Sequence, residues 1–247
     1  MFLTDDGIRL NAYLDMPAAP VDKCPICVII HGFTGHSEEA HITAVQEAMN
    51  EAGVATLRVD MYGHGKSEGE FRNHTLYKWA SNAMTAIDYA KSLDFVTDIY
   101  LCGHSQGGLL SILVASMERD VIKALILLSP AIVIADGAKK GNLLGTPFDP
   151  DHIPAELKSW DGRGLDGNYV RVAQTIDVDE CIRRYKGKTL IIHGTEDEAV
   201  PVSYSEDAAG KYSDCRAVFV EGDDHCYGRH LDVVTSEVKS FLEGLTV

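Results

Sequence analysis

The sequence predicts an α/β domain with a mostly parallel central sheet covered by helices on both faces. Apolar, β-branched runs alternate along the chain with longer segments whose apolar residues have helical spacing. This alternation is typical of parallel strands joined by crossover helices. With 247 residues, 45% of them hydrophobic, the chain is long enough for one large core or for two small ones. There are no internal repeats and no low-complexity tract.

Each expected element has its own signal in the chain. Val54 to Val59 is an apolar run that follows a helical segment and its stop signal, Gly53. The expected strands are 8–14, 26–30, 54–59, 99–102, 122–128, 189–192 and 217–220. The expected helices are 38–52, 76–93 and 108–115, with a further helix opening at Val200 and Pro201.

A turn bounded by glycines is the most informative short segment. Gly103-His104-Ser105-Gln106-Gly107 lies where an apolar strand passes into an apolar-faced helix. The glycines remove Cβ atoms that would clash in so sharp a turn, so Ser105 can adopt a strained backbone conformation above the sheet. The helix N-terminus that follows favours developing negative charge. This context predicts a catalytic nucleophile rather than a solvated turn serine.

A nucleophilic serine requires a base, and the base requires an orienting acid. After a nucleophile on a strand–turn–helix, the expected chain order is Ser, then Asp or Glu, then His. Asp197 and His225 each lie on a loop that follows a short apolar strand, in that order. Asp197 is therefore the predicted acid and His225 the predicted base. Glu196 and Glu198 are close competitors that we expect to be solvated flanks.

The tetrahedral oxyanion of acyl transfer needs two hydrogen-bond donors. One is predicted to be the backbone N–H of Gln106, which directly follows the nucleophile. The other is expected from the loop after the strand 26–30, where Gly32 and Gly35 allow a tight backbone path. The N–H of Phe33, between these glycines, is the candidate.

The nine other histidines are expected to serve structure or solvation. His31 and His193 end strands in His-Gly pairs and should hydrogen-bond neighbouring loops. His104 is expected to project to the opposite side of the turn from the nucleophile, and His230 to lie on a surface helix. The remaining histidines are expected to be solvated: His36, His41, His64, His74 and His152. Because no H-x-x-x-H or H-E-x-x-H spacing is present, no metal site is predicted.

Charge and cysteine content limit the partners and the location. A formal net charge of −15 argues against nucleic acid and anionic membranes, which would be repelled. No basic segment precedes an apolar one near Met1, so no signal peptide is expected. Cys24 and Cys27 form a lone C-x-x-C pair, a weak signal for zinc or redox chemistry. These features favour a cytoplasmic enzyme without cofactors. An exposed lid or edge strand could support a homodimer.

One interval, from about residue 131 to 185, lacks the alternation of strands and helices. It is rich in Gly, Pro, Asp and aromatic residues and is too long for an idle loop in a compact domain. We therefore predict an inserted lid subdomain at 131–185 and a core formed by 1–130 and 186–247. Because the interval precedes the acid strand, the lid should close over Ser105.

The chain resembles the α/β-hydrolases of the bacterial feruloyl (cinnamoyl) esterase type over essentially all 247 residues. The resemblance implies a serine esterase that hydrolyses hydroxycinnamoyl (feruloyl, p-coumaroyl, caffeoyl) esters, with a small aromatic ester as its partner. It also implies that Asp136 and Tyr169 contact the phenolic hydroxyl and that Trp160 lines the pocket. The matching stretches are His31–Ser37, Asp60–Ser67, Gly103–Gly108, Gly167–Arg171, His193-Gly194 with Asp197, and Asp224–Cys226.

Other enzyme and binding functions share parts of this pattern. A general carboxylesterase or thioesterase would have the same catalytic residues without preferring hydroxycinnamoyl acids. A serine peptidase shares the order of the triad but typically has a further domain. A dehalogenase or epoxide hydrolase would have Asp at position 105, and a binding module generally loses a triad member, whereas all three are present.

Overall fold

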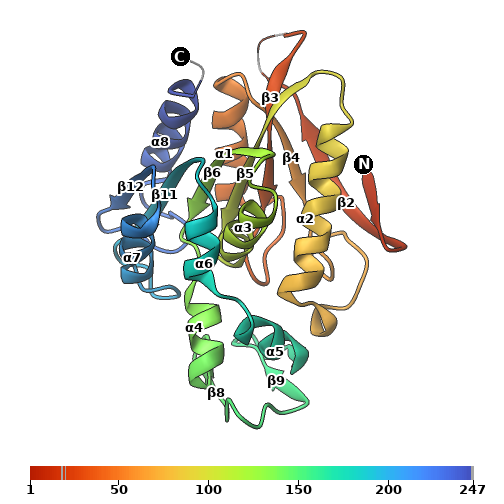
Figure 1. Ribbon diagram of the computed structural model, residues 1–247, viewed down its shortest axis with the longest axis vertical. Helices are drawn as coiled ribbons and strands as arrows, with labels where there is room; N and C mark the ends of the chain where they lie inside the picture. Colours follow the sequence, from red (N-terminus) through yellow and green to blue (C-terminus); the bar gives the residue numbers. More distant parts are fainter. Residues whose placement is uncertain (18, 20, 246–247) are drawn as a thin grey trace.

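The computed structural model describes residues 1–17, 19 and 21–245, which form a sheet flanked by helices on both faces (Figure 1). Within this part of the chain the main sheet has eight strands in the order β1-β2-β4-β3-β5-β6-β11-β12. The strands are β1 (Phe2–Asp5), β2 (Ile8–Asp15), β3 (Cys24–Ile30), β4 (Ala55–Val59), β5 (Val96–His104), β6 (Ile122–Leu128), β11 (Lys188–Gly194) and β12 (Cys215–Val220).

The sheet is parallel from β4 to β12, and only the β1–β2 and β2–β4 pairs are antiparallel. The mostly parallel sheet therefore agrees with the expectation from sequence. Strand β1 was not expected, because Phe2–Asp5 is short and only half apolar. It pairs with β2 at the edge of the sheet, where Phe2 is exposed.

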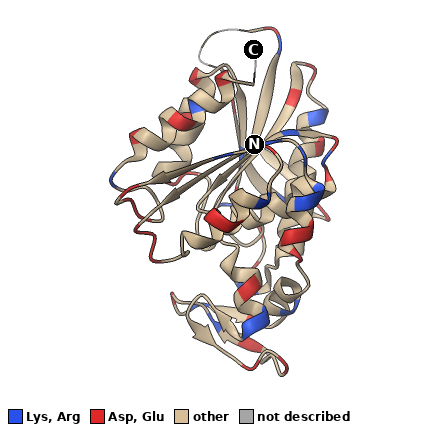
Figure 2. Ribbon diagram, turned by 60° about the vertical axis from the view of Figure 1, so that its left-hand side comes forward, with Lys and Arg blue, Asp and Glu red and all other residues tan. Residues whose placement is uncertain are grey.

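The side chains of strand β3 pack into two apolar clusters, one on each face of the sheet. Its alternate residues Ile26, Val28 and Ile30 pack in one apolar cluster with helices α2 (Leu76–Lys91), α3 (Gln106–Met117), α6 (Val178–Arg184) and α7 (Ser203–Lys211). The intervening Cys27 and Ile29 pack on the opposite face with α1 (Ala40–Glu51) and α8 (Leu231–Glu243). A strand covered on both faces must be apolar at every position, which explains the continuous apolar runs. Charged side chains lie mainly on the helices and loops (Figure 2).

The inserted segment leaves the sheet after β6 and projects beyond the strands' carboxyl ends (Figure 1). It contains α4 (Val133–Lys140), α5 (Asn168–Gln174) and two small hairpins, formed by β7 (Asn142–Leu143) with β8 (Thr146–Pro147) and by β9 (Glu156–Lys158) with β10 (Gly164–Asp166). These elements share an apolar cluster with Leu76 and Leu109 of the core helices. The last part of the predicted lid, α6, instead packs in the core against the sheet.

Among the described residues, no helix combines the length and the apolar character that crossing a membrane requires.

Candidate active site

Ser105 lies at the sharp turn between β5 and α3. Its backbone has φ 55° and ψ −120°, a conformation that a residue with a side chain adopts only under constraint. A Cβ on residue 103 would lie 2.2 Å from the carbonyl oxygen of Gly107, and one on residue 107 would lie 2.4 Å from that of Ile30. The glycines are thus required for the turn to pack, as the sequence predicts.

Ser105, His225 and Asp197 form one hydrogen-bonded line. His225 Nε2 lies 2.9 Å from Ser105 Oγ, and His225 Nδ1 lies 2.6 Å from Asp197 Oδ2. Because β5, β11 and β12 are parallel, the loops after them meet at one edge of the sheet. Residues 120 and 28 positions apart in the chain are brought into contact in this way.

The carboxylate of Asp197 is fixed on both oxygens. Oδ1 accepts hydrogen bonds from the amides of Ala199 and Val200, both at 2.8 Å, and Oδ2 also lies 3.0 Å from His193 Nε2. Burial tends to raise the pKa of Asp197, but the hydrogen bonds from His193, His225 and the Val200 amide hold that pKa well below its ordinary value. The group is therefore an anion suited to orient His225 and to stabilise the imidazolium that forms during proton transfer.

The two competing carboxylates take other positions. Glu196 is exposed and forms an ion pair with Arg229, and Glu198 is exposed at the rim of the cavity. Neither forms a hydrogen bond to His225 in the described residues. The acid that sequence order favours is the one whose side chain is fully buried beside the histidine.

The two predicted oxyanion donors flank the nucleophile. Gln106 is the first residue of α3, and the first amides of a helix have no partner within it. Phe33 lies on the loop after β3, which runs so close to the nucleophile that a Cβ on residue 32 would lie 3.0 Å from Ser105 Cβ. Both amides therefore belong to backbone that surrounds the serine, and their role as donors stays a prediction.

A buried aspartate holds this loop in place. Asp60, 1% exposed, accepts hydrogen bonds from the amide of Ser37 at 2.7 Å, from the amide of Lys66 at 2.9 Å and from Asn11 Nδ2 at 3.0 Å. A Cβ on residue 65 would lie 2.3 Å from the Asp60 carboxyl carbon, so the loop needs glycine there. The Asp60–Ser67 segment, matched above only by resemblance, thus serves to fix the loop that carries Phe33.

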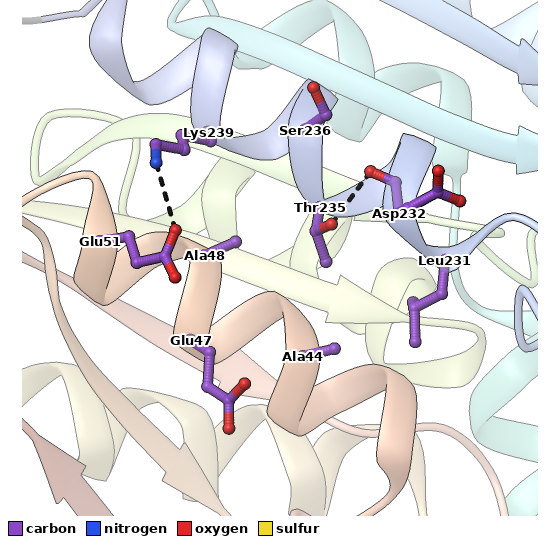
Figure 3. Close-up of a pocket in the computed structure, with 9 residues that line it drawn as sticks. All are labelled: Ala44, Glu47, Ala48, Glu51, Leu231, Asp232, Thr235, Ser236 and Lys239. Carbon is purple, nitrogen blue, oxygen red and sulfur yellow. Dashed lines mark hydrogen bonds and ion pairs between the residues drawn. The ribbon is translucent and has the colours of Figure 1, made fainter.

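A cavity of about 700 Å³ lies over Ser105, between the core loops and the lid. That volume is in the range of small-molecule sites. A second pocket, between α1 and α8, is lined by none of Ser105, His225 and Asp197 (Figure 3). The residues around the first cavity are Gly32, Phe33, Thr34, Glu39, His104, Ser105, Val133, Asn142, Leu144, Gly145, Trp160, Glu198, Ala199, Val200, Pro201, His225 and Cys226.

The three predicted lid contacts take different positions. Trp160 lines the cavity and is 68% exposed. Asp136, on α4, is outside the lining, and its carboxylate accepts hydrogen bonds from Tyr204 at 2.5 Å and Lys140 at 2.8 Å. Tyr169 is fully buried, and its hydroxyl donates to Gln106 Oε1 at 2.5 Å. Sequence reasoning missed both Tyr204 and this link to Gln106.

Three histidines that were expected to be solvated are buried: His41, His64 and His74. This expectation was wrong because His64 and His74 pack against Trp79, while His41, in α1, packs against His104. His64 Nε2 accepts a hydrogen bond from the Thr34 amide at 3.3 Å. Burial lowers the pKa of His64 to about 2 and that of His74 to about 4, so both are neutral.

Comparison with known proteins agrees with this geometry. The serine aminopeptidase S33 family of hydrolases matches residues 22–150. A solved structure of Est1E from Butyrivibrio proteoclasticus with ferulic acid bound is 60% identical, covers 100% of both chains and has a TM-score of 0.98. The predicted α/β-hydrolase fold is thereby confirmed.

Two curated relatives are more distant. A monoglyceride lipase homolog of Monkeypox virus is 32% identical over 47% of this chain and 41% of its own length. The human mitochondrial palmitoyl-protein thioesterase ABHD10 is 28% identical over 55% of this chain and 40% of its own length. The chain thus spans less than half the length of either relative. From the match to more than half of its residues, we conclude that the chain belongs to the serine aminopeptidase S33 family of α/β-hydrolases.

Proposed function

We propose that the protein is a serine esterase that hydrolyses hydroxycinnamoyl esters through an acyl-enzyme. The observation that carries the proposal is the hydrogen-bonded line Ser105–His225–Asp197, of which Ser105 and His225 line the cavity. The substrate class is supported by the ferulic acid bound to Est1E, which matches this chain over its whole length.

In the proposed reaction each residue has its own step. His225 Nε2 takes the proton of Ser105 Oγ as the oxygen attacks the ester carbonyl, and it returns that proton to the departing alcohol. Asp197 keeps the other ring nitrogen protonated and oriented. The amides of Phe33 and Gln106 would stabilise the tetrahedral oxyanion. Water then attacks the acyl-enzyme with His225 again as base, and the hydroxycinnamic acid leaves.

The lid supplies the proposed substrate contacts. Trp160 is a flat apolar surface at the cavity and suits an aromatic ring. The Asp136 carboxylate already accepts hydrogen bonds from Tyr204 and Lys140. A phenolic hydroxyl that binds Asp136 would displace one of these donors or add a further hydrogen bond. Tyr169 would likewise have to exchange Gln106 for the substrate. We retain 131–185 as the proposed lid, set on a core of 1–130 and 186–247.

A general carboxylesterase or thioesterase is the second candidate, favoured by the similarity to a palmitoyl-protein thioesterase over 55% of the chain. Its triad chemistry would be identical, so only substrate preference separates the two. Predictions that stay untested are a cytoplasmic location, a homodimer, and the exclusion of nucleic acid and membranes as partners.

Two measurements test the proposal. We expect kcat/KM to be highest for ferulate, p-coumarate and caffeate esters and much lower for butyrate and peptide esters. Comparable values for butyrate would favour the general carboxylesterase. Ser105→Ala should lower kcat by about 10³-fold or more while the chain stays folded. The control Ser213→Ala, at an exposed turn between α7 and β12, should keep full activity.

A further inference from the structure

Three potential metal ligands from distant parts of the chain converge beside the catalytic residues. His41 lies in the first turn of α1, His104 is the last residue of β5, and Cys226 lies on the loop between β12 and α8. One ring nitrogen of each histidine and the sulfur of Cys226 all lie within 4.8 Å of one another. Both histidines are buried and the thiol is exposed, so a dissolved ion can reach the cluster from the cavity.

The two imidazoles face each other and share one proton, which His41 Nε2 donates to His104 Nδ1. His104 Nε2 lies 2.9 Å from the carbonyl oxygen of His225, which requires a proton on that nitrogen. His104 Nδ1 is therefore unprotonated, and it lies 3.1 Å from His41 Nε2. A Cβ on residue 32 would lie 3.1 Å from His104 Nδ1, so Gly32 leaves space at this point. Burial keeps both rings neutral, the form that binds metals.

We propose that His41, His104 and Cys226 bind one Zn²⁺ ion, with water in the fourth position. Imidazole nitrogen and thiolate sulfur are both zinc ligands, and three protein ligands plus water is the usual arrangement of an open zinc site. On binding, the thiol proton is released to solvent and the proton between the two imidazoles moves to the other ring nitrogen of His41. The metal then occupies the place of that proton.

Zinc at this site inhibits the enzyme. The rings of His104 and His225 lie 4.8 Å apart, and Cys226 directly follows His225. A divalent cation there disfavours the imidazolium that His225 must become, and it holds the loop that carries the base. This consequence rests on the proposed function, whereas zinc binding itself does not.

Zinc binding can be measured on the intact protein without reference to activity. Titration calorimetry with Zn²⁺ should give one site per chain. X-ray absorption of the zinc-loaded protein should show one sulfur at about 2.3 Å and two imidazole nitrogens at about 2.0 Å. A zinc shell without sulfur, or with sulfur but no imidazole, overturns the site and needs no variant to do so.

Variants identify the ligands. Cys226→Ser should weaken Zn²⁺ binding by at least about tenfold, and His41→Gln should do the same while still donating a hydrogen bond to His104. The matched control is Cys215→Ala, which removes a half-buried thiol from the edge strand β12. Unchanged affinity in Cys226→Ser overturns the site. If Zn²⁺ affinity falls in Cys226→Ser but not in His41→Gln, the thiol binds zinc without His41, and the proposed three-ligand site is also overturned.

Inhibition is tested separately, by comparing the activity of each variant with and without Zn²⁺. Hydrolysis of a p-coumarate ester by the parent and by Cys215→Ala should fall as Zn²⁺ fills the site and recover on adding a chelator. Cys226→Ser should require at least about tenfold more Zn²⁺ for the same fractional loss. Stoichiometric zinc binding without loss of activity overturns the inhibitory role. If the parent cleaves no hydroxycinnamoyl ester at all, the proposed function fails while the calorimetric result stands.

Discussion

The carboxyl edge of the sheet and the lid above it are held together in different ways. At the sheet edge, a buried carboxylate ties three segments, because Asp60 binds Asn11, Ser37 and Lys66. The lid shares an apolar cluster with the core, and its polar contacts with the core include both the buried hydrogen bond of Tyr169 to Gln106 and the exposed ion pair of Arg72 with Glu156. Exposed ion pairs contribute little stability, whereas breaking buried ones is costly. In the proposed mechanism, the chemistry takes place at the sheet edge and the lid selects the substrate.

The largest effect is expected at the sheet edge. Asp197→Asn should lower kcat by about 10⁴-fold with little change in fold, because an amide cannot hold His225 in the same tautomer. The control is Glu196→Gln, whose parent carboxylate pairs with Arg229 on the surface. Steady-state kinetics on a p-coumarate ester check both. Less than about tenfold loss in Asp197→Asn would remove this residue from the triad.

Stability should depend strongly on the buried carboxylate of the loops. Asp60→Ala should lower the free energy of unfolding by roughly 3–5 kcal/mol, since it leaves three buried donors without their acceptor. Urea denaturation measures this. Asp88→Ala, which removes an exposed carboxylate on α2, should cost less than about 1 kcal/mol. Equal losses of unfolding free energy in the two variants would contradict the contrast between a buried, hydrogen-bonded carboxylate and an exposed one.

Acid should destabilise the sheet edge through its buried histidines. Burial lowers the pKa of His31, His41 and His74 to about 4, below the ordinary value of about 6.5 expected in the unfolded chain. Between these values the unfolded state binds more protons. The contribution of these histidines to the free energy of unfolding is therefore fully present above pH about 6.5. It is lost as the pH drops toward 4, by up to about 1.4 kcal/mol per pH unit for each group. A urea midpoint that stays constant between pH 7 and 5 would contradict this.

The smallest effect concerns the contact between lid and core. The resemblance to feruloyl esterases implies that Tyr169 contacts the substrate, whereas the structure shows its hydroxyl bonded to Gln106 and its ring 5.8 Å from that of Phe33. Tyr169→Phe keeps the ring, and we expect about a tenfold loss of kcat with either ester if the hydroxyl positions Gln106. Loss confined to p-coumarate esters, with cinnamate esters spared, would instead establish the substrate contact. Asp136→Ala, in the same assay, should affect only p-coumarate esters.

Sequence reasoning reached the core more fully than the lid. The alternation of strands and helices was readable because burial on both faces makes a strand such as β3 continuously apolar. Ser105, Asp197 and His225 could be ordered because each follows a strand of a parallel sheet. The lid offered no such rule, since its elements are short and its contacts, such as Asp136 with Tyr204, join unrelated segments. The cluster of His41, His104 and Cys226 was missed for the same reason, as spacing motifs detect only ligands that are close in sequence.

The order of strands in the sheet has a consequence for the making of the protein. Ser105 and the turn that strains it belong to the first half of the chain, but the base lies after β12, at the sheet's far edge. During synthesis, a ribosome has therefore added about half of the chain after the serine before His225 exists. In the proposed mechanism the serine has no partner to take its proton during that interval, so we expect the nascent chain not to cleave esters. We expect activity only after β12 has paired with the rest of the sheet. Esterase activity would therefore indicate that the whole sheet has formed.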